Sequence, residues 1–340
     1  MTTALAIAAS APPEARGLER DEVRMLVGRT DGITHAIFRD LPDHLRPGDL
    51  LVFNDSATVN GQVDAHLEGR GPVVLHVATK LDSGERVVEV RTFPDAERAI
   101  LDARAGDIVR TGAATLTLHA PYPRRNSSPT GDGSRLWRAG VTGDLDRHLR
   151  HRGRPIAYGY LDRRYPLSAY QSVFAERPGS AEMPSAGRPF TTELVTRLVI
   201  RGIRMAPITL HTGLSSQEAG EAPLPERFAV SPATAAIVNS TRSAGGRVIA
   251  VGTTVTRALE SAVKRGKATA ASGWTERVVT PADPPQLVDG LITGWHDPEA
   301  SHLQLVEAVA GAELTSDAYA EACSRGYLWH EFGDSALLLP

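Results

Sequence analysis

The stretch from Arg247 to Arg265 combines residue types that together suit ligand binding. Val248–Val251 is continuously apolar and predicts a buried strand, which the run Gly252-Thr253-Thr254 follows directly. We expect one of the two threonines to cap a helix, because a threonine hydroxyl accepts a hydrogen bond from a first-turn N–H group. The other free N–H groups favour an anion or an electron-rich ligand atom, and Arg257 and Glu260 lie near the same turn. Taken alone, the pattern also fits an ordinary strand-to-helix connection.

Four further loops place polar or glycine residues next to predicted strands and helices. The apolar strand Leu50–Phe53 ends in Asn54-Asp55-Ser56, which also fits a simple Asx turn. The other three loops are Pro184–Phe190, Thr209–Gly213 and Gly294–His296. If the sheet is parallel, several of these loops share one edge and line a single cleft. The sequence has no nucleophile elbow, Walker loop or complete dinucleotide fingerprint, so these residues indicate only a small-molecule- or nucleotide-binding α/β enzyme.

Alternating strands and helices in the C-terminal half must position these loops. Thr192–Arg201 has the spacing of a helix with Thr191 as its cap, and Ser231-Pro232 opens a second helix. Ile203–Leu210 between them has the pattern of a strand. Such alternation predicts a largely parallel sheet. Near the N-terminus, residues 23–38 predict a hairpin that turns at Asp31-Gly32.

Residues 61–150 have a different texture, with short alternating segments separated by glycine, proline and a polar tract (Arg124–Arg135) that we expect to be a mobile loop. The predicted strands are Gln62–Leu67, Val73–Val77, Arg86–Arg91, Asp107–Arg110, Thr115–His119 and Leu136–Val141. Strands at this spacing predict a small all-β barrel or sandwich. We therefore expect a mixed α/β main domain made of residues 17–60 and 151–340, interrupted by an inserted β-barrel domain at 61–150.

The composition limits the class of protein. A chain of 340 residues with 41% hydrophobic and 23% charged residues fits a soluble globular protein with one large or two smaller domains. The net charge of −3 argues against attraction of the whole surface to nucleic acid. The single cysteine, Cys323, excludes an internal disulfide. The sequence shows no export signal and no apolar run of membrane-spanning length, so we expect a cytoplasmic protein without membrane attachment.

A local basic cluster is the candidate contact for a nucleic acid. It consists of Arg147, Arg150, Arg152, Arg154, Arg163 and Arg164. Such a cluster suits a phosphate backbone, although a solvated helix face has the same pattern. His148 and His151 lie three residues apart within it, but no carboxylate or cysteine stands at metal-ligand spacing. We therefore expect no metal site.

Several ordered motifs resemble the S-adenosylmethionine:tRNA ribosyltransferase-isomerase (QueA) family of queuosine biosynthesis. The similarity runs from about Pro13 to the C-terminus. It rests on LPDHLRPGDLLVFNDSATV (41–59), AYQSVFA (169–175), MPSAGRPFT (183–191), ITLHTG (208–213), GGRVIAVGTTVTRALES (245–261) and the C-terminal HLQLVEAVAG and FGDSALLL. Several motifs in matching order are far more specific than any one of them.

The resemblance implies a mixed α/β domain interrupted by a β-barrel, and it also implies a reaction. The family transfers the ribosyl part of S-adenosylmethionine to the aminomethyl group of a 7-deazaguanine base in tRNA, which forms epoxyqueuosine and releases adenine and methionine. This chemistry needs a base that removes a proton beside the sulfonium and a donor to the departing adenine. S-adenosylmethionine is then a co-substrate, tRNA is the partner, and no metal is implied.

The matched motifs supply the candidate site residues. The catalytic candidates are Asp55, His211, Glu260 and His296. The substrate-binding candidates are Asn54, Tyr170, Gln171, Pro184, Ser185, Ala186, Gly187, Arg188, Phe190, Thr191, Thr209, Gly213, Gly252, Thr253, Thr254 and Arg257. Arg257 suits bidentate binding of a carboxylate or phosphate.

The chain also departs from the family pattern inside these motifs. NDSATV stands where the family has NDTRV, and Arg188 and Pro189 stand where it has a leucine and a histidine. The family's histidine-rich segment after LHVG is absent, and WHDPEASH keeps His296 but not the serine-threonine pair. Two alternatives therefore stay open, namely a paralogue that uses S-adenosylmethionine on a small-molecule acceptor and a non-catalytic nucleoside- or RNA-binding relative. The oligomeric state is not determined by the sequence.

Overall fold

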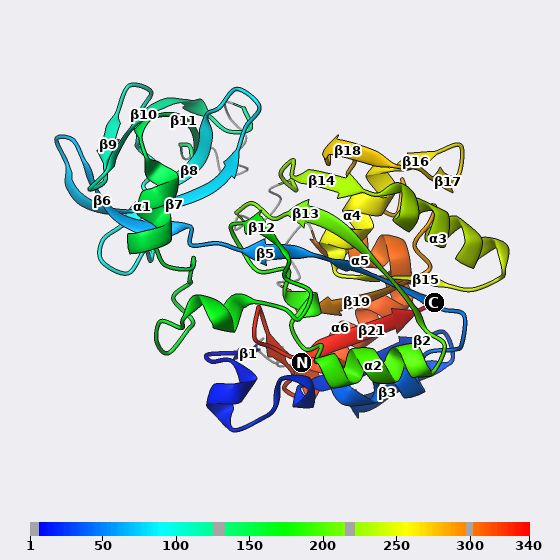
Figure 1. Cartoon of the computed structure of the whole chain (residues 1–340). Coiled ribbons are helices and arrows are strands. Elements are labelled where there is room, and N and C mark those ends of the chain that lie inside the picture. Colours follow the sequence, from blue (N-terminus) through cyan, green and yellow to red (C-terminus); the bar gives the residue numbers. More distant parts are fainter. Residues whose placement is uncertain (1–6, 125–132, 215–221, 297–301) are drawn as a thin grey trace.

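A nine-stranded sheet forms the body of the computed structural model, and a closed six-stranded barrel stands beside it (Figure 1). The structure describes residues 7–124, 133–214, 222–296 and 302–340. In sheet order the nine strands are β18 (Ala271–Trp274), β14 (Arg227–Val230), β13 (Arg204–His211), β4 (Leu50–Asn54), β15 (Val248–Val251), β19 (Gly290–Gly294), β21 (Ser335–Leu339), β2 (Arg24–Arg29) and β3 (Gly32–Ile37).

The centre of the sheet is parallel. β13, β4, β15 and β19 pair in parallel register, as the alternation of strands and helices predicts. β14 and β18 on one side and β21 against β19 on the other are antiparallel, so the whole sheet is mixed. The carboxyl ends of β15 and β19 therefore reach the same edge, where a ligand can bind.

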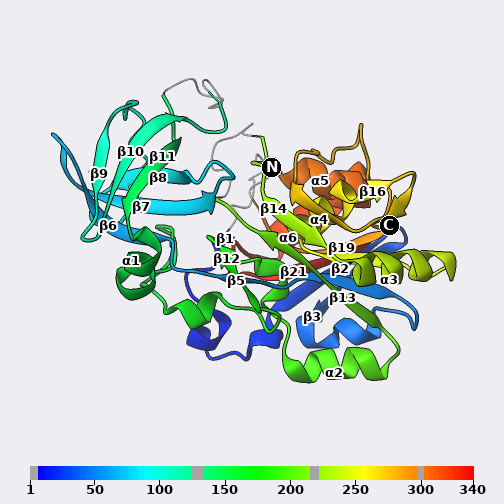
Figure 2. The same cartoon turned by 45° about the horizontal axis from the view of Figure 1, so that its top comes forward.

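Helices cover both faces of this sheet (Figure 2). α2 (Thr192–Ile200) packs on one face, where Leu194 and Leu198 join a core with the odd-numbered residues of β4. The other face carries α3 (Pro232–Ser243), α4 (Thr253–Ser261), α5 (His302–Ala310) and α6 (Ala312–Ser324). The apolar helix faces and the two-sided burial of the strands together form the main core.

The predicted barrel is confirmed. Its strands follow the order β10 (Ala114–Pro121), β11 (Leu136–Gly143), β8 (Arg86–Thr92), β7 (Gly71–Lys80), β6 (Gln62–Leu67) and β9 (Ile108–Arg110), which closes on β10. α1 (Leu145–Arg152) follows the last strand, and its Leu145 and Leu149 pack into the barrel core. Most of the predicted mobile loop at Arg124–Arg135 lies outside the described residues.

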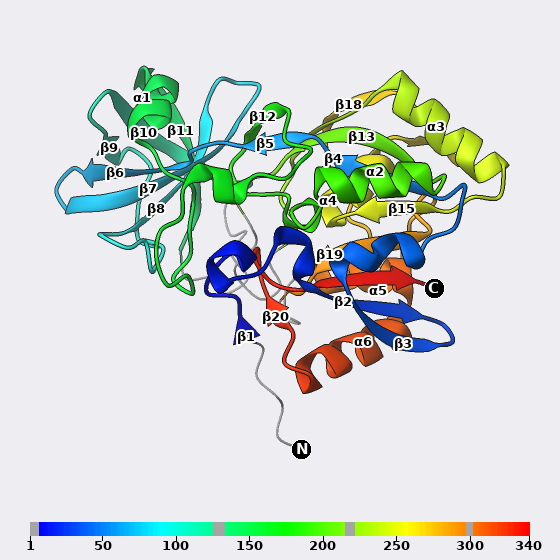
Figure 3. The same ribbon diagram turned by 60° about the horizontal axis from the view of Figure 1, so that its bottom comes forward.

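Short elements complete the fold, and one pair of them lies between the barrel and the main sheet (Figure 3). β5 (Ser56–Thr58) continues from β4 and pairs with β12 (Arg177–Ser180), and β1 (Ile7–Ala8) pairs with β20 (Leu328–Trp329). β16 (Val263–Lys264) and β17 (Lys267–Ala268) form a hairpin after α4. The 3₁₀ turns are η1 (Pro13–Arg16), η2 (Arg20–Glu22), η3 (Phe38–Asp43), η4 (Leu167–Tyr170) and η5 (Ser185–Gly187).

Two features refine the expectations from sequence. The hydroxyls of Thr191 and Ser231 cap α2 and α3 as predicted. The last helix begins at Ala312, after Gly311, although Ser316 inside it has the residue type of a helix cap. Within the described ranges, no helix is long and apolar enough to span a bilayer.

Candidate active site

A cavity of about 560 Å³ opens at the carboxyl ends of β15 and β19. Segments of the barrel, of the chain between α1 and α2, and of the main sheet all contribute to its wall. The lining includes Arg91, Glu97, Tyr158–Tyr160, Glu182–Ala186, Thr212–Leu214, Glu226, Val251–Thr254, Arg257, Thr293, Gly294, His296, His302, His330 and Glu331. The predicted residues brought together here are Pro184, Ser185, Ala186, Gly213, Gly252, Thr253, Thr254, Arg257 and His296.

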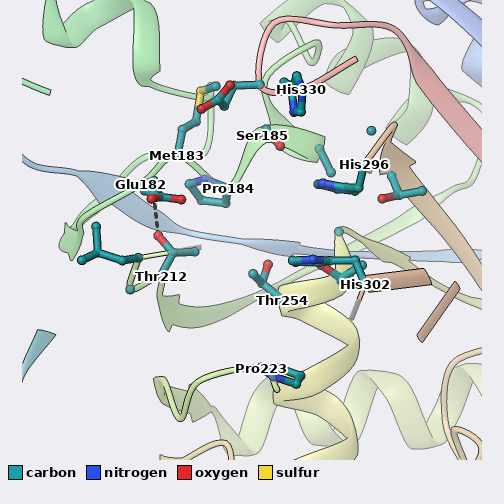
Figure 4. Close-up of a pocket in the computed structure, with 18 of the residues that line it drawn as sticks. Glu182, Met183, Pro184, Ser185, Thr212, Pro223, Thr254, His296, His302 and His330 are labelled. Carbon is teal, nitrogen blue, oxygen red and sulfur yellow. Dashed lines mark hydrogen bonds between the residues drawn. The ribbon is translucent and has the colours of Figure 1, made fainter. Parts of the chain in front are cut away.

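The start of α4 borders this cavity. Gly252 is the N-cap residue at φ 103°, a conformation that favours glycine, and no side chain caps the helix. The expected threonine cap is therefore wrong, because the helix already begins at Thr253 and both threonines lie in its first turn. Thr254 instead points into the cavity (Figure 4). The first turn of α4 keeps its capacity to bind an electron-rich ligand atom.

Arg257 forms part of the wall through an ion pair. Its guanidinium contacts Glu226 at 2.5 Å and donates to the Leu224 carbonyl at 2.7 Å. Glu226 also accepts from the Gly213 N–H at 3.1 Å, and burial raises the pKa of this carboxyl although Arg257 opposes the shift. Arg257 therefore fixes the Gly213 loop against α4 in addition to lining the cavity.

Two imidazoles face the cavity from the α5 side. His296 follows β19 and His302 starts α5, and their rings stack with centroids 4.7 Å apart at an angle of 11° (Figure 4). Burial, then the neighbouring His302 and His330, lower the pKa of His296 to about 3. Burial, then Arg257, lower the pKa of His302 to about 4. Both rings are therefore neutral at pH 7 and can each donate one hydrogen bond and accept another.

The side of the cavity that carries Glu182 is aromatic and acidic. The Tyr158 hydroxyl donates to the Glu182 carboxylate, and the Tyr160 hydroxyl donates to Glu331. The Tyr158 and Tyr160 rings stack at 6.1 Å, and His330 stacks on Tyr160 at 4.6 Å. Figure 4 shows Glu182 and the imidazoles of His296 and His302 on different sides of the cavity.

Sequence reasoning missed several of these residues, among them His302, Tyr158, Tyr160 and Glu331. His302 stands six positions after His296 in WHDPEASH, so a second histidine in the same motif was an available signal. Tyr158 and Tyr160 alternate with Gly159 in PIAYGY, but nothing in that pattern shows which way the rings face. Glu331 precedes the FGDSALLL motif and carries no chemical signature of its own.

Asp55, Asn54 and Thr209 lie outside this cavity. Asn54 exchanges hydrogen bonds with the main chain of Leu210 and so fastens β4 to β13. Asp55 accepts from the Thr209 hydroxyl at 2.6 Å and pairs with Arg177 at 3.2 Å. Asp55, Arg177 and Thr209 line a separate depression of about 410 Å³ beside β13 and β14.

His211 and Glu260 also lie outside the cavity. The His211 Nδ1 is 2.8 Å from the Ser56 hydroxyl, and its ring lies so close to Gly179 that an added Cβ there would be 2.5 Å from Nδ1. Burial lowers the pKa of His211. The carboxylate of Glu260 is buried and accepts hydrogen bonds from Arg277 and from the chain at residues 286–288.

Three predicted binding residues hold the chain between α1 and α2 in place. Gln171 exchanges hydrogen bonds with the Thr58 main chain on β5. Arg188 donates to the Ala169 carbonyl and to Glu14, each at 2.9 Å. Tyr170 is buried against the Phe332 ring at 5.2 Å.

The other three belong to the turn that leads into α2. Phe190 is fully buried against Phe38, with ring centroids 5.1 Å apart. The Thr191 hydroxyl accepts from the Leu194 N–H at 3.1 Å as the cap of α2. Gly187 closes η5, the short turn that presents Ser185 and Ala186 to the cavity.

The basic cluster divides into paired and unpaired arginines. Arg147, Arg150 and Arg152 are exposed on α1. Arg154 pairs with Asp64, and Arg164 contacts the Pro94 carbonyl and lies 3.5 Å from Asp95. Among the described residues, no group of three or more His, Cys, Asp or Glu side chains is arranged to hold a metal ion.

Comparisons with known proteins agree with this architecture. The model of the family described as "Queuosine biosynthesis protein" matches residues 4–338. The S-adenosylmethionine:tRNA ribosyltransferase-isomerase of Anaeromyxobacter dehalogenans is 35% identical over 98% of this chain and 96% of its own length. The enzyme of the same name from Thermus thermophilus is 34% identical over 96% of this chain and 97% of its own length.

A solved structure extends the similarity to the fold. The crystal structure of S-adenosylmethionine tRNA ribosyltransferase from Thermotoga maritima aligns with a TM-score of 0.53 and 26% identity. The alignment covers 98% of this chain and 96% of the other. With the family model matched from end to end and relatives above 30% identity over nearly the whole length, the chain belongs to the queuosine biosynthesis protein family.

Proposed function

We propose that this protein transfers the ribosyl part of S-adenosylmethionine to a 7-aminomethyl-7-deazaguanine base in tRNA. The transferred ribosyl group is isomerised to give epoxyqueuosine, and adenine and methionine are released. One observation carries the proposal: the cavity gathers segments from the motifs shared with the family, namely Pro184–Ala186, Gly213, Gly252–Thr254 and His296. Its volume of about 560 Å³ is in the range of sites that enclose a ligand the size of a nucleoside.

The two stacked imidazoles suit the departing adenine. An adenine anion is a poor leaving group unless a donor stabilises the charge that develops on its ring nitrogens. Because the pKa values of His296 and His302 are lowered to about 3 and about 4, each ring at neutral pH is an imidazole with one N–H to donate. A neutral donor of this kind stabilises charge in the transition state without itself losing a proton. We assign this role to His296, with His302 stacked beside it.

The first turn of α4 suits the polar part of S-adenosylmethionine. Thr253 and Thr254 line the cavity, and Gly252 leaves the helix start without a side-chain cap. The methionine carboxylate of S-adenosylmethionine is an anion of the kind that such N–H groups bind. S-adenosylmethionine is the co-substrate in this proposal, and Ser185 and Ala186 complete the wall beside Gly252.

Contact with tRNA is assigned to the arginines near the barrel. Arg164 touches the Pro94-Asp95 loop, which leads to Glu97 on the cavity wall. Arg147, Arg150 and Arg152 are exposed on α1 and suit phosphate groups further along the same RNA. A tRNA substrate supports a cytoplasmic location for the enzyme.

Release of adenine from S-adenosylmethionine in the presence of the aminomethyl-bearing tRNA tests the proposal. We expect His296→Ala to lower kcat about 100-fold, because removal of one donor to a developing anion costs that order. His211→Ala is the matched comparison, since His211 is likewise half-buried but lies outside the cavity. An equal loss in both variants would contradict the assignment to His296.

The same assay separates the two alternatives. Adenine release with the free deazapurine amine but not with tRNA would favour a small-molecule acceptor. Binding of S-adenosylmethionine by folded protein, without adenine release from any mixture, would favour a non-catalytic relative.

A further inference from the structure

The stacked tyrosines hold two carboxyl groups at the cavity. Tyr160 donates its hydroxyl hydrogen to Glu331, and Tyr158 does the same to Glu182. His330 extends the stack, with its ring 4.6 Å from Tyr160 at an angle of 15°. The wall therefore presents aromatic faces and carboxyl oxygens next to each other, and the adenine-binding role proposed above uses none of them.

Glu331 differs from the fully buried acidic residues of the chain. Each acidic residue among the buried polar side chains has an arginine partner: Asp49 with Arg247, Asp55 with Arg177, Glu89 with Arg91, Glu226 with Arg257, Glu260 with Arg277 and Asp334 with Arg24. Glu331 is partly buried, and among the described residues no arginine, lysine or histidine forms an ion pair with its carboxyl. Within the described part of the chain, this carboxyl is therefore left without a countercharge.

We propose that Glu331 binds the positively charged group of a substrate. Two such groups enter the reaction proposed above, namely the sulfonium of S-adenosylmethionine and the primary ammonium of the aminomethyl base, and the inference rests on that reaction for their identity. A desolvated carboxylate attracts an organic cation strongly, and aromatic ring faces such as those of Tyr160 and His330 add to the attraction. The substrate would then supply the charge that arginines supply to the other buried acids.

Tyr160 is a positioning residue in this proposal. Its hydroxyl holds one carboxyl oxygen of Glu331, and its ring is held in turn between Tyr158 and His330. Loss of the hydroxyl leaves the stacked ring in place but frees the carboxyl to rotate. We expect Tyr160→Phe to weaken cation binding about threefold and Glu331→Gln to weaken it about tenfold, because Gln keeps the shape but not the charge.

Direct binding to the purified full-length protein tests the sulfonium. S-adenosylmethionine and S-adenosylhomocysteine differ in the positive charge on sulfur, so calorimetric Kd values for both isolate the contribution of that charge. We expect Glu331→Gln to raise the Kd for S-adenosylmethionine about tenfold and to leave the Kd for S-adenosylhomocysteine within twofold of wild type. Glu193→Gln, on the exposed side of α2, is the matched control and should change neither Kd.

The second arm tests the ammonium. Kd values are compared for tRNA that carries the aminomethyl base and for the same tRNA with guanine at that position. A tenfold loss confined to the aminomethyl tRNA would assign Glu331 to the acceptor. The first comparison is the ratio of the Kd values for S-adenosylmethionine and S-adenosylhomocysteine, and the second is the ratio for aminomethyl tRNA and guanine tRNA. If Glu331→Gln changes neither ratio, the proposal is wrong. These readouts need no turnover, so absence of adenine release in the wild-type protein would contradict the proposed function without contradicting the cation site.

Discussion

Glu260 at the end of α4 and Glu331 in the cavity wall are both glutamates, but the protein surrounds them very differently. The Glu260 carboxylate is 2% exposed and receives hydrogen bonds from Arg277 at 2.9 Å, from the N–H of Gln286 at 2.9 Å and from that of Leu287 at 2.8 Å. The N–H of Val288 adds a fourth at 3.2 Å. Glu331 accepts a hydrogen bond from the Tyr160 hydroxyl and forms no ion pair among the described residues.

The difference separates a structural carboxylate from one that is available to a ligand. A buried charge whose hydrogen-bonding capacity is filled by the protein has little left for a substrate. Glu260 therefore fastens residues 286–288, which lead into β19, to the end of α4. Glu331 lines the cavity and has no ion-pair partner among the described residues. The sequence draws attention to Glu260 because it lies near the Gly252-Thr253-Thr254 turn, whereas only the surrounding partners show which of the two carboxyl groups is available to a ligand.

Removal of Glu260 should have the largest effect on stability. Glu260→Ala leaves Arg277 and three N–H groups without their acceptor, and the loss of one partner from such a buried network costs about 3–5 kcal/mol. We expect denaturant unfolding to report this destabilisation, while the kcat of the protein that remains folded stays within a few fold of wild type. A variant as stable as wild type but inactive in adenine release would return Glu260 to the catalytic residues.

Substitution of Glu331 should raise the free energy of unfolding, whereas removal of Glu260 should lower it. Burial raises the pKa of this carboxyl from 4.5 to about 7. Since the folded state then holds a proton that the unfolded chain has lost, the free energy of unfolding falls as pH rises from about 4.5 to 7. Glu331→Gln removes this dependence, so we expect it to stabilise the free protein by about 2 kcal/mol at pH 8, discounted for partial exposure, and not at pH 4.5.

Unfolding curves of both proteins at pH 5, 6, 7 and 8 measure this difference. The titratable or charged groups around Glu331 are Tyr158, Tyr160, Glu182 and His330 in the cavity and Arg20, Arg188 and Asp334 in the small cleft behind it. They are the same in both proteins, so the difference between the curves isolates residue 331. A difference that does not change with pH would show that the carboxyl is neutralised by a neighbour, and would weaken the contrast with Glu260.

The sequence predicts most of the fold because the fold depends on local patterns. The apolar run Val248–Val251, the capping residues Thr191 and Ser231 and the six short barrel segments each form where the pattern places them. Residue types alone do not locate the start of the last helix, because Ser316 has the type of a cap but lies inside the helix that follows Gly311, whose φ is 84°.

The candidate site is less predictable, because it depends on which way side chains face across long separations. Gly252–Thr254 and His296 were found through strand-end loops that share one edge. Tyr160 and Glu331 meet across 171 positions in the sequence, and no local pattern reports such a contact. For the same reason the sequence could not show that the N–H groups of residues 286–288 occupy the hydrogen-bonding capacity of the Glu260 carboxylate.

Asp55 lies between these two extremes and should show the smallest effect. Its carboxylate accepts from Thr209 at 2.6 Å and pairs with Arg177, whose side chain is 64% exposed. Asp55→Asn keeps an oxygen for the Thr209 hydroxyl and loses only a largely solvated ion pair, which costs about 0.5–1 kcal/mol. Since the separate depression that Asp55 faces does not share its lining with the cavity, we expect kcat for adenine release to stay within threefold of wild type. Thr209→Val is the companion variant, because it removes the donor while keeping the charge. A loss of 100-fold in Asp55→Asn with unchanged stability would place a reacting group at Asp55, and would mean that the depression beside β13 and the cavity beside β19 act on one substrate.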